Sequence, residues 1–120
     1  MPPESRFDLI FFNPPYVPTE TGHQLKLTER LGVDEDQVWD GGSDGTEVLR
    51  KFLIQAVEFL SPKGRIVFGV QPIFVPEEMV HTVLEDVDMV LAKRITKRLV
   101  PSVAYVVEPN RVGVHDRQPN

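Results

Sequence analysis

A short turn, Asn13 to Tyr16, directly follows an apolar run and combines side chains that can hold a flat polar group. Asn13 offers a side-chain oxygen that accepts hydrogen bonds. Pro14 and Pro15 fix φ and restrict the residue before each, so the turn is stiff. Tyr16 offers an aromatic ring that can lie against a planar group. Asn and Pro are also common in turns that only end a strand, so that alternative must be weighed.

With the Phe7-Asp8-Leu9-Ile10 segment before it, the turn resembles the Asn-Pro-Pro-Tyr motif of class I S-adenosylmethionine-dependent N-methyltransferases. Their substrate nitrogens belong to amides or exocyclic amino groups and are poor nucleophiles, so the enzyme must hold both N–H groups and aim the lone pair. The resemblance implies that the Asn13 side-chain oxygen and the Pro14 carbonyl accept these N–H groups, on a turn stiffened by Pro15. It further implies that Tyr16 stacks on the substrate and that Phe12 and Asn13 border the cofactor.

A second segment, Trp39 to Gly45, resembles the Asp-Gly-Gly-x-Asp-Gly sequence of HemK-type methyltransferases, which modify a glutamine of translation release factors. Its glycines permit a tight backbone path over the mouth of the site and lead into a helix. A glycine-rich connector that happens to precede a helix is the alternative. The resemblance implies a glutamine side-chain amide as the methyl acceptor and a release factor as the protein partner.

Four further features predict the elements that position these motifs. Residues 6–13 form a short apolar run, which predicts a strand buried on both faces of a parallel sheet. About 30 residues of weak periodicity follow, in which Leu25, Leu27 and Leu31 can pin a short helix onto the body. Asp44 and Glu47 have the spacing of a capping box that starts a helix of about four turns. Ser61 to Gly64 then end this helix.

The remaining pattern completes the fold. Arg65–Val70 predicts a second buried strand, and Pro76 begins a second helix whose apolar face continues to Val87. Met89–Val100 and Ser102–Glu108 are rich in β-forming residues and predict an antiparallel hairpin joined at Pro101. We therefore predict an α/β fold, the carboxy-terminal half of a Rossmann-like methyltransferase sheet, with two parallel strands and their helices and then a β-hairpin. In that family the corresponding fourth, fifth, seventh and sixth strands lie side by side.

The expected domain is a partial methyltransferase domain over 1–108, followed by a flexible polar tail over 109–120. The resemblance implies S-adenosyl-L-methionine as cofactor. The family binds it mainly through a glycine-rich turn after the first strand and an acidic residue that closes the second, and neither precedes Phe7. The sequence thus predicts the substrate clamp without the principal cofactor-binding elements.

Charge and composition restrict the partners. The chain has 120 residues, a net charge of −5 and no cysteine, which excludes disulfides and thiol catalysis. His23, His81 and His115 are far apart, so we predict no metal site. No apolar run reaches the roughly 20 residues of a membrane span. We expect a cytoplasmic or nuclear protein that does not enter membranes.

The acidic residues are concentrated in the segment that follows Tyr16 and runs through the second motif to the first predicted helix. Residues 17–45 contain seven acidic and two basic residues, so this segment alone has the net charge of the whole chain. It disfavours a phosphate-rich substrate. The only basic cluster comprises Lys93, Arg94, Lys97 and Arg98. These residues can contact RNA or a ribosomal factor, but we favour protection of an exposed strand edge against aggregation.

Two alternatives to glutamine methylation remain open. The same motif serves adenine-N6 methyltransferases of DNA or RNA, since four residues do not distinguish the two amino groups. A non-catalytic module that acts by binding, or by self-association through the exposed edge strand, is the other alternative. The resemblance also raises a small zinc-binding activator subunit, but this partner would pair with a third strand that the sequence does not contain.

Overall fold

The computed structural model describes residues 6–111. Its strands are β1 (Phe7–Phe12), β2 (Leu60–Val70), β3 (Met89–Thr96) and β4 (Val103–Pro109), and its α-helices are α1 (Thr19–Gln24), α2 (Leu27–Leu31), α3 (Glu47–Ala56) and α4 (Glu77–Asp86). Two short 3₁₀ helices span Asp36–Val38 and Val57–Phe59. No helix among the described residues has the length and apolar character to cross a membrane.

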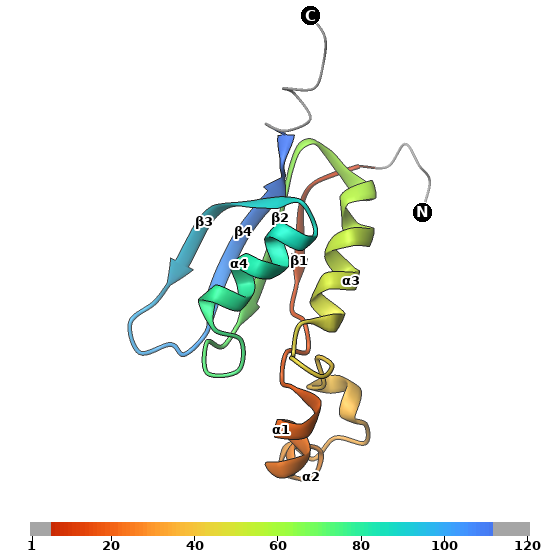
Figure 1. Ribbon diagram of the computed structural model, residues 1–120, viewed down its shortest axis with the longest axis vertical. Coiled ribbons are helices and arrows are strands. Elements are labelled where there is room, and N and C mark those ends of the chain that lie inside the picture. Colours follow the sequence, from red (N-terminus) through yellow and green to blue (C-terminus); the bar gives the residue numbers. More distant parts are fainter. Residues whose placement is uncertain (1–5, 112–120) are drawn as a thin grey trace, which may run out of the picture.

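The four strands form one sheet in the order β1-β2-β4-β3 (Figure 1). β1 and β2 are parallel, whereas β4 runs antiparallel to both β2 and β3. β1 and β2 are joined through the acidic segment and α3, and the right-handed connection expected for parallel strands needs such a crossover. The predicted fold class and strand order are both confirmed.

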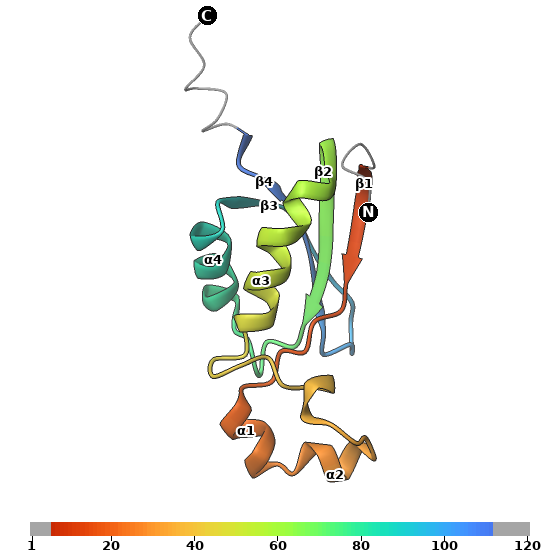
Figure 2. The same ribbon diagram turned by 90° about the vertical axis from the view of Figure 1, so that its right-hand side faces the viewer.

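Helices α3 and α4 cover the same face of the sheet, which Figure 2 shows side-on. Both helices have apolar residues at the three- and four-residue spacing that gives a helix one apolar face. The core between helices and sheet is made of aliphatic residues with two large aromatic side chains from β2 and β4; its fully buried members are Leu49, Leu53, Ile66, Phe68, Val70, Val75, Val80, Val83, Tyr105 and Val107. The predicted start of α4 near Pro76 is confirmed.

β1 differs from its prediction. Phe7, Leu9 and Phe11 are 40%, 50% and 73% exposed, so the expectation of a strand buried on both faces is wrong for the described residues. The reason is position, because β1 lies at the edge of the sheet and the helices cover only one face. Ile10 and Phe12 point to the covered face and pack against the core.

Residues 17–45 form a small lobe below the carboxyl ends of β1 and β2 (Figures 1 and 2). Of the three leucines predicted to hold it, Leu25 and Leu31 are 37% and 54% exposed and do not do so, whereas Leu27 is half-buried. Trp39, which is 4% exposed, holds it instead. Its ring lies directly against Gly22, where an added Cβ would come within 1.9 Å of it. One indole buries more apolar surface than several small contacts, and only glycine leaves room for it.

Two boundaries also differ. α3 is shorter than predicted, and residues 61–64 lie inside β2 as an irregularity opposite Phe7 and Leu9 rather than as a helix end. At the other end, β4 includes Pro109, and Asn110 donates its backbone N–H to the carbonyl of Asp88 at 3.0 Å. Ordered contacts therefore pass the predicted boundary at 108. The rest of the predicted tail, 112–120, and His115 within it lie outside the described residues.

Candidate functional site

The predicted active-site turn occupies the carboxyl end of β1, as its sequence implies. Asn13 is exposed, Pro14 is buried, and Pro15 and Tyr16 are half-buried. In open α/β sheets this edge is where ligands bind. The turn therefore presents a free amide side chain to solvent from an anchored backbone.

The two sequence motifs lie in direct contact. Val17 donates its N–H to the Trp39 carbonyl, and Gly41 donates its N–H to the Val17 carbonyl, both at 2.9 Å. An added Cβ on Gly41 would meet the Pro15 carbonyl oxygen and the Tyr16 Cα, both at 2.7 Å. The glycine segment is thus packed on the backbone of the turn. Its glycines are required by this close approach, as the sequence predicts.

Gly45 completes this packing and sets the start of α3. Its φ of +85° is a left-handed conformation, and an added Cβ would lie 2.4 Å from the Tyr16 carbonyl oxygen. The chain reverses here and enters α3 at Glu47. The helix that covers the core therefore begins at the wall of the candidate site.

The predicted capping box does not form. The Asp44 carboxylate accepts the Thr46 N–H at 2.8 Å and its hydroxyl at 2.6 Å, while the Glu47 carboxylate accepts the Ser43 N–H at 3.0 Å. Because Gly45 is left-handed, each carboxylate closes its own turn instead of sharing one box. The Thr46 hydroxyl lowers the pKa of Asp44, and the Ser43 hydroxyl lowers the pKa of Glu47.

Tyr16 is held by the loop between β2 and α4. Its ring centroid lies 6.1 Å from that of Phe74, tilted by 41°. Burial raises the pKa of the Tyr16 phenol, and a side-chain hydrogen bond with Gln71 partly opposes this rise. The phenol thus stays neutral, which suits a ring that orients a substrate and does not suit a base. Gln71 and Phe74 were missed by sequence reasoning because no motif links their loop to the turn.

Phe12 packs inward. Its ring stacks on Phe52 of α3, with centroids 3.8 Å apart and planes at 19°. It also lines a hollow of about 460 Å³ beside Asn13, whose other lining residues are Phe11, Val67, Phe68, Gly69 and Ala104. Its cofactor contact remains a prediction. The lining of this hollow is apolar except for Asn13, so the hollow lacks the groups that would hold the carboxylate and ribose of S-adenosylmethionine and does not by itself fit this cofactor.

The acidic side chains of the lobe are partly engaged in its own structure. Asp40 accepts the Thr19 hydroxyl at 2.6 Å and the Gly42 N–H at 3.0 Å, which ties the start of α1 to the glycine segment. Asp36 accepts the Thr28 hydroxyl and bonds to His23 Nε2 at 3.0 Å. No group of three or more metal-ligating side chains occurs in residues 6–111.

Comparison with known proteins finds sequence similarity to methyltransferases. No family model matches the chain. The chain is 38% identical over 64 residues to the ribosomal protein uL3 glutamine methyltransferase of Bradyrhizobium diazoefficiens, a match covering 53% of this chain and 19% of that protein. It is 41% identical over 61 residues to the release factor glutamine methyltransferase of the same bacterium, covering 51% of this chain and 20% of that protein.

A solved structure of the ribosomal protein L11 methylase from Lactobacillus delbrueckii subsp. bulgaricus aligns with 88% of this chain and 38% of that chain, at 12% identity and a TM-score of 0.49. The matched half of the chain is similar in sequence to these methyltransferases. Within that class, its similarity is to the HemK-type glutamine methyltransferases. The predicted resemblance is thereby confirmed. The matched segment spans about a fifth of each of the two relatives.

Proposed function

We propose that this protein takes part in the S-adenosylmethionine-dependent methylation of a glutamine side-chain amide in a protein substrate. The main support is the position of the Asn13 to Tyr16 turn at the carboxyl end of β1, where Gly41 and Gly45 pack against its backbone. The cofactor supplies the methyl group. The residues of this chain bind and orient the nitrogen that receives it.

In this proposal Asn13 and Pro14 hold the substrate amide. The Asn13 side-chain oxygen accepts one N–H and the Pro14 carbonyl accepts the other, which directs the nitrogen lone pair away from the turn. Tyr16 fixes the plane of the amide by stacking. Contacts of the glycine segment with Pro15 and Tyr16 keep these groups from shifting. Such positioning is what a weakly nucleophilic nitrogen requires.

The acidic lobe favours a protein substrate over a nucleic acid. Residues 17–45 have seven acidic and two basic residues and lie next to the turn. Nucleic-acid binding depends on neutralising phosphates, and this surface repels them. Two relatives named for a ribosomal protein and for a release factor suggest those two proteins as the first substrates to test.

Methyl transfer from labelled S-adenosylmethionine to purified release factor and to ribosomal protein uL3 tests the proposal, with the wild type, Asn13→Ala and Asn110→Ala compared. We expect Asn13→Ala to lower kcat/KM by about 100-fold or more, the usual scale for loss of one positioned hydrogen-bonding group. Asn110→Ala is the control of the same residue type, since Asn110 follows β4 and bonds to Asp88.

The product distinguishes the alternatives. Protease digestion and mass spectrometry should find the label on a glutamine side chain, and acid hydrolysis should release it as methylamine because acid cleaves the side-chain amide. Label on adenine in added DNA or RNA would establish the nucleic-acid reaction instead. Asn13→Ala activity within a few-fold of the wild type would show that Asn13 does not hold the nitrogen.

A further inference from the structure

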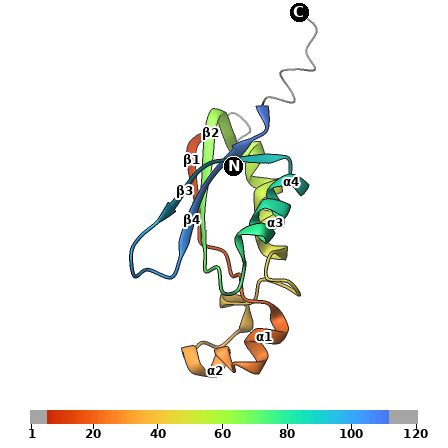
Figure 3. The ribbon, with the colours of Figure 1, turned by 60° about the vertical axis from the view of Figure 1, so that its left-hand side comes forward.

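The turn between β3 and β4, residues Lys97 to Val100, is hereafter called the hairpin tip. β3 ends at Thr96, and Val100 donates its N–H to the Lys97 carbonyl at 3.1 Å, which closes the turn. β4 is antiparallel to β2, so the hairpin tip projects from the same end of the sheet as the carboxyl ends of β1 and β2 (Figure 3). The hairpin tip therefore extends from the end of the sheet that carries the candidate site.

Leu99 is unfavourable for the fold in two ways. Its φ is +66°, and the closing hydrogen bond puts it at the third turn position, where a positive φ ordinarily selects glycine or asparagine. It is also 96% exposed, so its side chain gains no burial in return. A strained backbone that the core does not require is the kind of outlier from which a functional role can be argued. An apolar partner surface would give this side chain the burial it lacks.

The charges of the hairpin tip are not explained by edge protection. Arg94 lies on β3 and pairs with Glu77 of α4 at 3.1 Å. Lys97 and Arg98 follow the end of the strand, and no ion pair is found for either within residues 6–111. Protection of a strand edge thus accounts for Lys93 and Arg94. It does not account for Lys97 and Arg98, two basic residues next to Leu99 that have no ion pair within residues 6–111.

Two hollows that share lining residues lie between the hairpin tip and Asn13. A hollow of about 240 Å³ is lined by Lys97 and Val100 and extends to Gly69 and Ala104. These last two residues face each other across β2 and β4 and also line the hollow beside Asn13. Their small side chains lower the surface between the two hollows. A bound segment can therefore contact Asn13 and the hairpin tip together.

We propose that the hairpin tip is a docking arm for an acidic segment of the protein substrate, with Leu99 entering an apolar pocket of the partner and Lys97 and Arg98 pairing with carboxylates around it. The identity of this partner rests on the function proposed above. A protein fits better than a nucleic acid because the tip has no aromatic ring on which a base could stack. The acidic lobe at the same edge would also repel phosphates.

Fluorescence anisotropy with two labelled peptides tests the docking arm without methyl transfer. One peptide alternates glutamate with leucine, and the other alternates glutamate with serine. We expect the wild type to bind the leucine peptide more tightly, and Leu99→Gly to remove this preference and weaken binding about tenfold or more. The double variant K97E/R98E should weaken both peptides, and added salt should do the same. Ile54→Ala and Lys51→Glu on α3 are the matched controls.

Leu99→Gly separates binding from folding. Glycine adopts a positive φ without strain, so the thermal midpoint of this variant should be no lower than that of the wild type while binding is lost. Equal peptide binding by wild type, Leu99→Gly and K97E/R98E, or no binding by any, would overturn the docking arm. Tighter binding of an oligouridylate of equal charge would overturn the choice of a protein partner. A variant that loses peptide binding but methylates glutamine in the protein substrate as well as the wild type does would leave the proposed function standing and reject only the docking arm.

Discussion

Gly41 is the residue at which the two sequence motifs touch. An added Cβ would lie 2.4 Å from the Gly45 carbonyl oxygen and 2.7 Å from the Pro15 carbonyl oxygen, both of which are backbone atoms that cannot rotate away. We expect Gly41→Ala to lower the free energy of unfolding by about 1–3 kcal/mol, the usual cost of overpacking. Methylation should fall by more than stability alone explains, since the clash displaces the turn that is proposed to hold the substrate.

Gly69→Ala is the control for this variant. The nearest atom to its added Cβ is the Val103 carbonyl oxygen at 3.7 Å, an ordinary van der Waals distance. Its effect on unfolding should stay within about 0.5 kcal/mol. Urea titration followed by circular dichroism measures both variants. Equal stability of Gly41→Ala and Gly69→Ala would mean that the glycine segment is not packed on the turn as described.

Single residues also show where sequence reasoning reaches its limit. The motifs predict special roles for Asn13 and the glycines. Gly41 and Gly45 have close backbone contacts that only glycine permits, and the role of Asn13 stays a prediction. The support of Tyr16 by Phe74 does not follow from a motif, since this contact joins segments that are distant in sequence and carry no shared pattern. The sequence identifies Trp39 only as the first residue of the second motif. Its role as the anchor of the lobe depends on the absence of a side chain at Gly22.

At the scale of elements, the lobe formed by residues 17–45 is held by a network that depends on pH. His23 Nε2 lies 3.0 Å from the Asp36 carboxylate, and the Trp39 indole N–H donates to the Thr28 hydroxyl at 3.0 Å. The Asp36 hydrogen bond raises the pKa of His23. The Thr28 hydroxyl and then His23 lower the pKa of Asp36.

The signs of these shifts define a pH window. A raised His23 pKa stabilises the fold fully below its ordinary value of about 6.5, and this contribution is lost as pH rises through the folded value. A lowered Asp36 pKa stabilises the fold above its ordinary value of about 3.9, and this contribution is lost as pH falls through the folded value. The lobe should thus be held best between about pH 4 and 6.5.

An NMR titration of His23 checks this network. The pKa of His23 should fall in Asp36→Asn, because the neutral amide no longer favours the imidazolium. Asp34→Asn removes an acidic residue from the same segment without removing this hydrogen bond, and it should leave most of the shift in place. The protection factors of backbone amides in α1 and α2, which correct for the base-catalysed rise in intrinsic exchange, should also be lower at pH 8 than at pH 6. The same His23 pKa in wild type and Asp36→Asn would contradict the described contact.

The sequence predicts which strands the sheet contains and how they pair. It does not predict which strand residues are buried. Alternating and continuous apolar runs indicate strands, and the short link between β3 and β4 leaves only an antiparallel pairing. The exposure of Leu9 and Phe11 could not be predicted in the same way. Burial of a strand depends on what lies beside and above it, and an apolar run alone does not specify those neighbours. The same limit explains why Leu25 and Leu31 were overvalued in the lobe.

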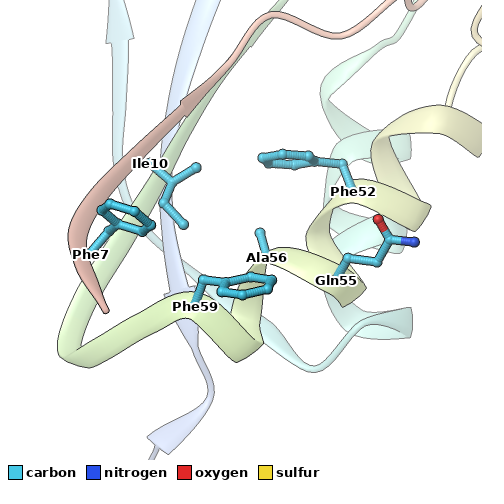
Figure 4. A pocket seen from close by; sticks show the side chains of 6 residues that line it. All are labelled: Phe7, Ile10, Phe52, Gln55, Ala56 and Phe59. Atoms are coloured by element: carbon cyan, nitrogen blue, oxygen red, sulfur yellow. The ribbon is translucent and has the colours of Figure 1, made fainter. Parts of the chain in front are cut away.

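At the scale of the whole molecule, the two edges of the sheet differ. The β3 edge carries Lys93 and Arg94 and an irregularity between Leu91 and Lys93, devices that oppose strand addition. The β1 edge has Leu9 and Phe11 exposed and borders a hollow of about 260 Å³ against α3 (Figure 4), lined by Phe7, Ile10, Phe52, Gln55, Ala56 and Phe59. Within residues 6–111 only the β3 edge is protected, and the β1 edge presents backbone without a strand partner next to apolar surface.

We therefore expect this chain to self-associate through β1. Sedimentation velocity should show a sedimentation coefficient that rises with protein concentration, and Phe11→Lys should suppress the rise by placing a charge on the edge. Ile54→Lys is the matched control, because Ile54 is 61% exposed but lies on α3, where the backbone is already hydrogen-bonded within the helix. A fully monomeric wild type would contradict self-association through β1. Equal suppression by both variants would mean that exposed apolar area alone, and not the open strand edge, governs association.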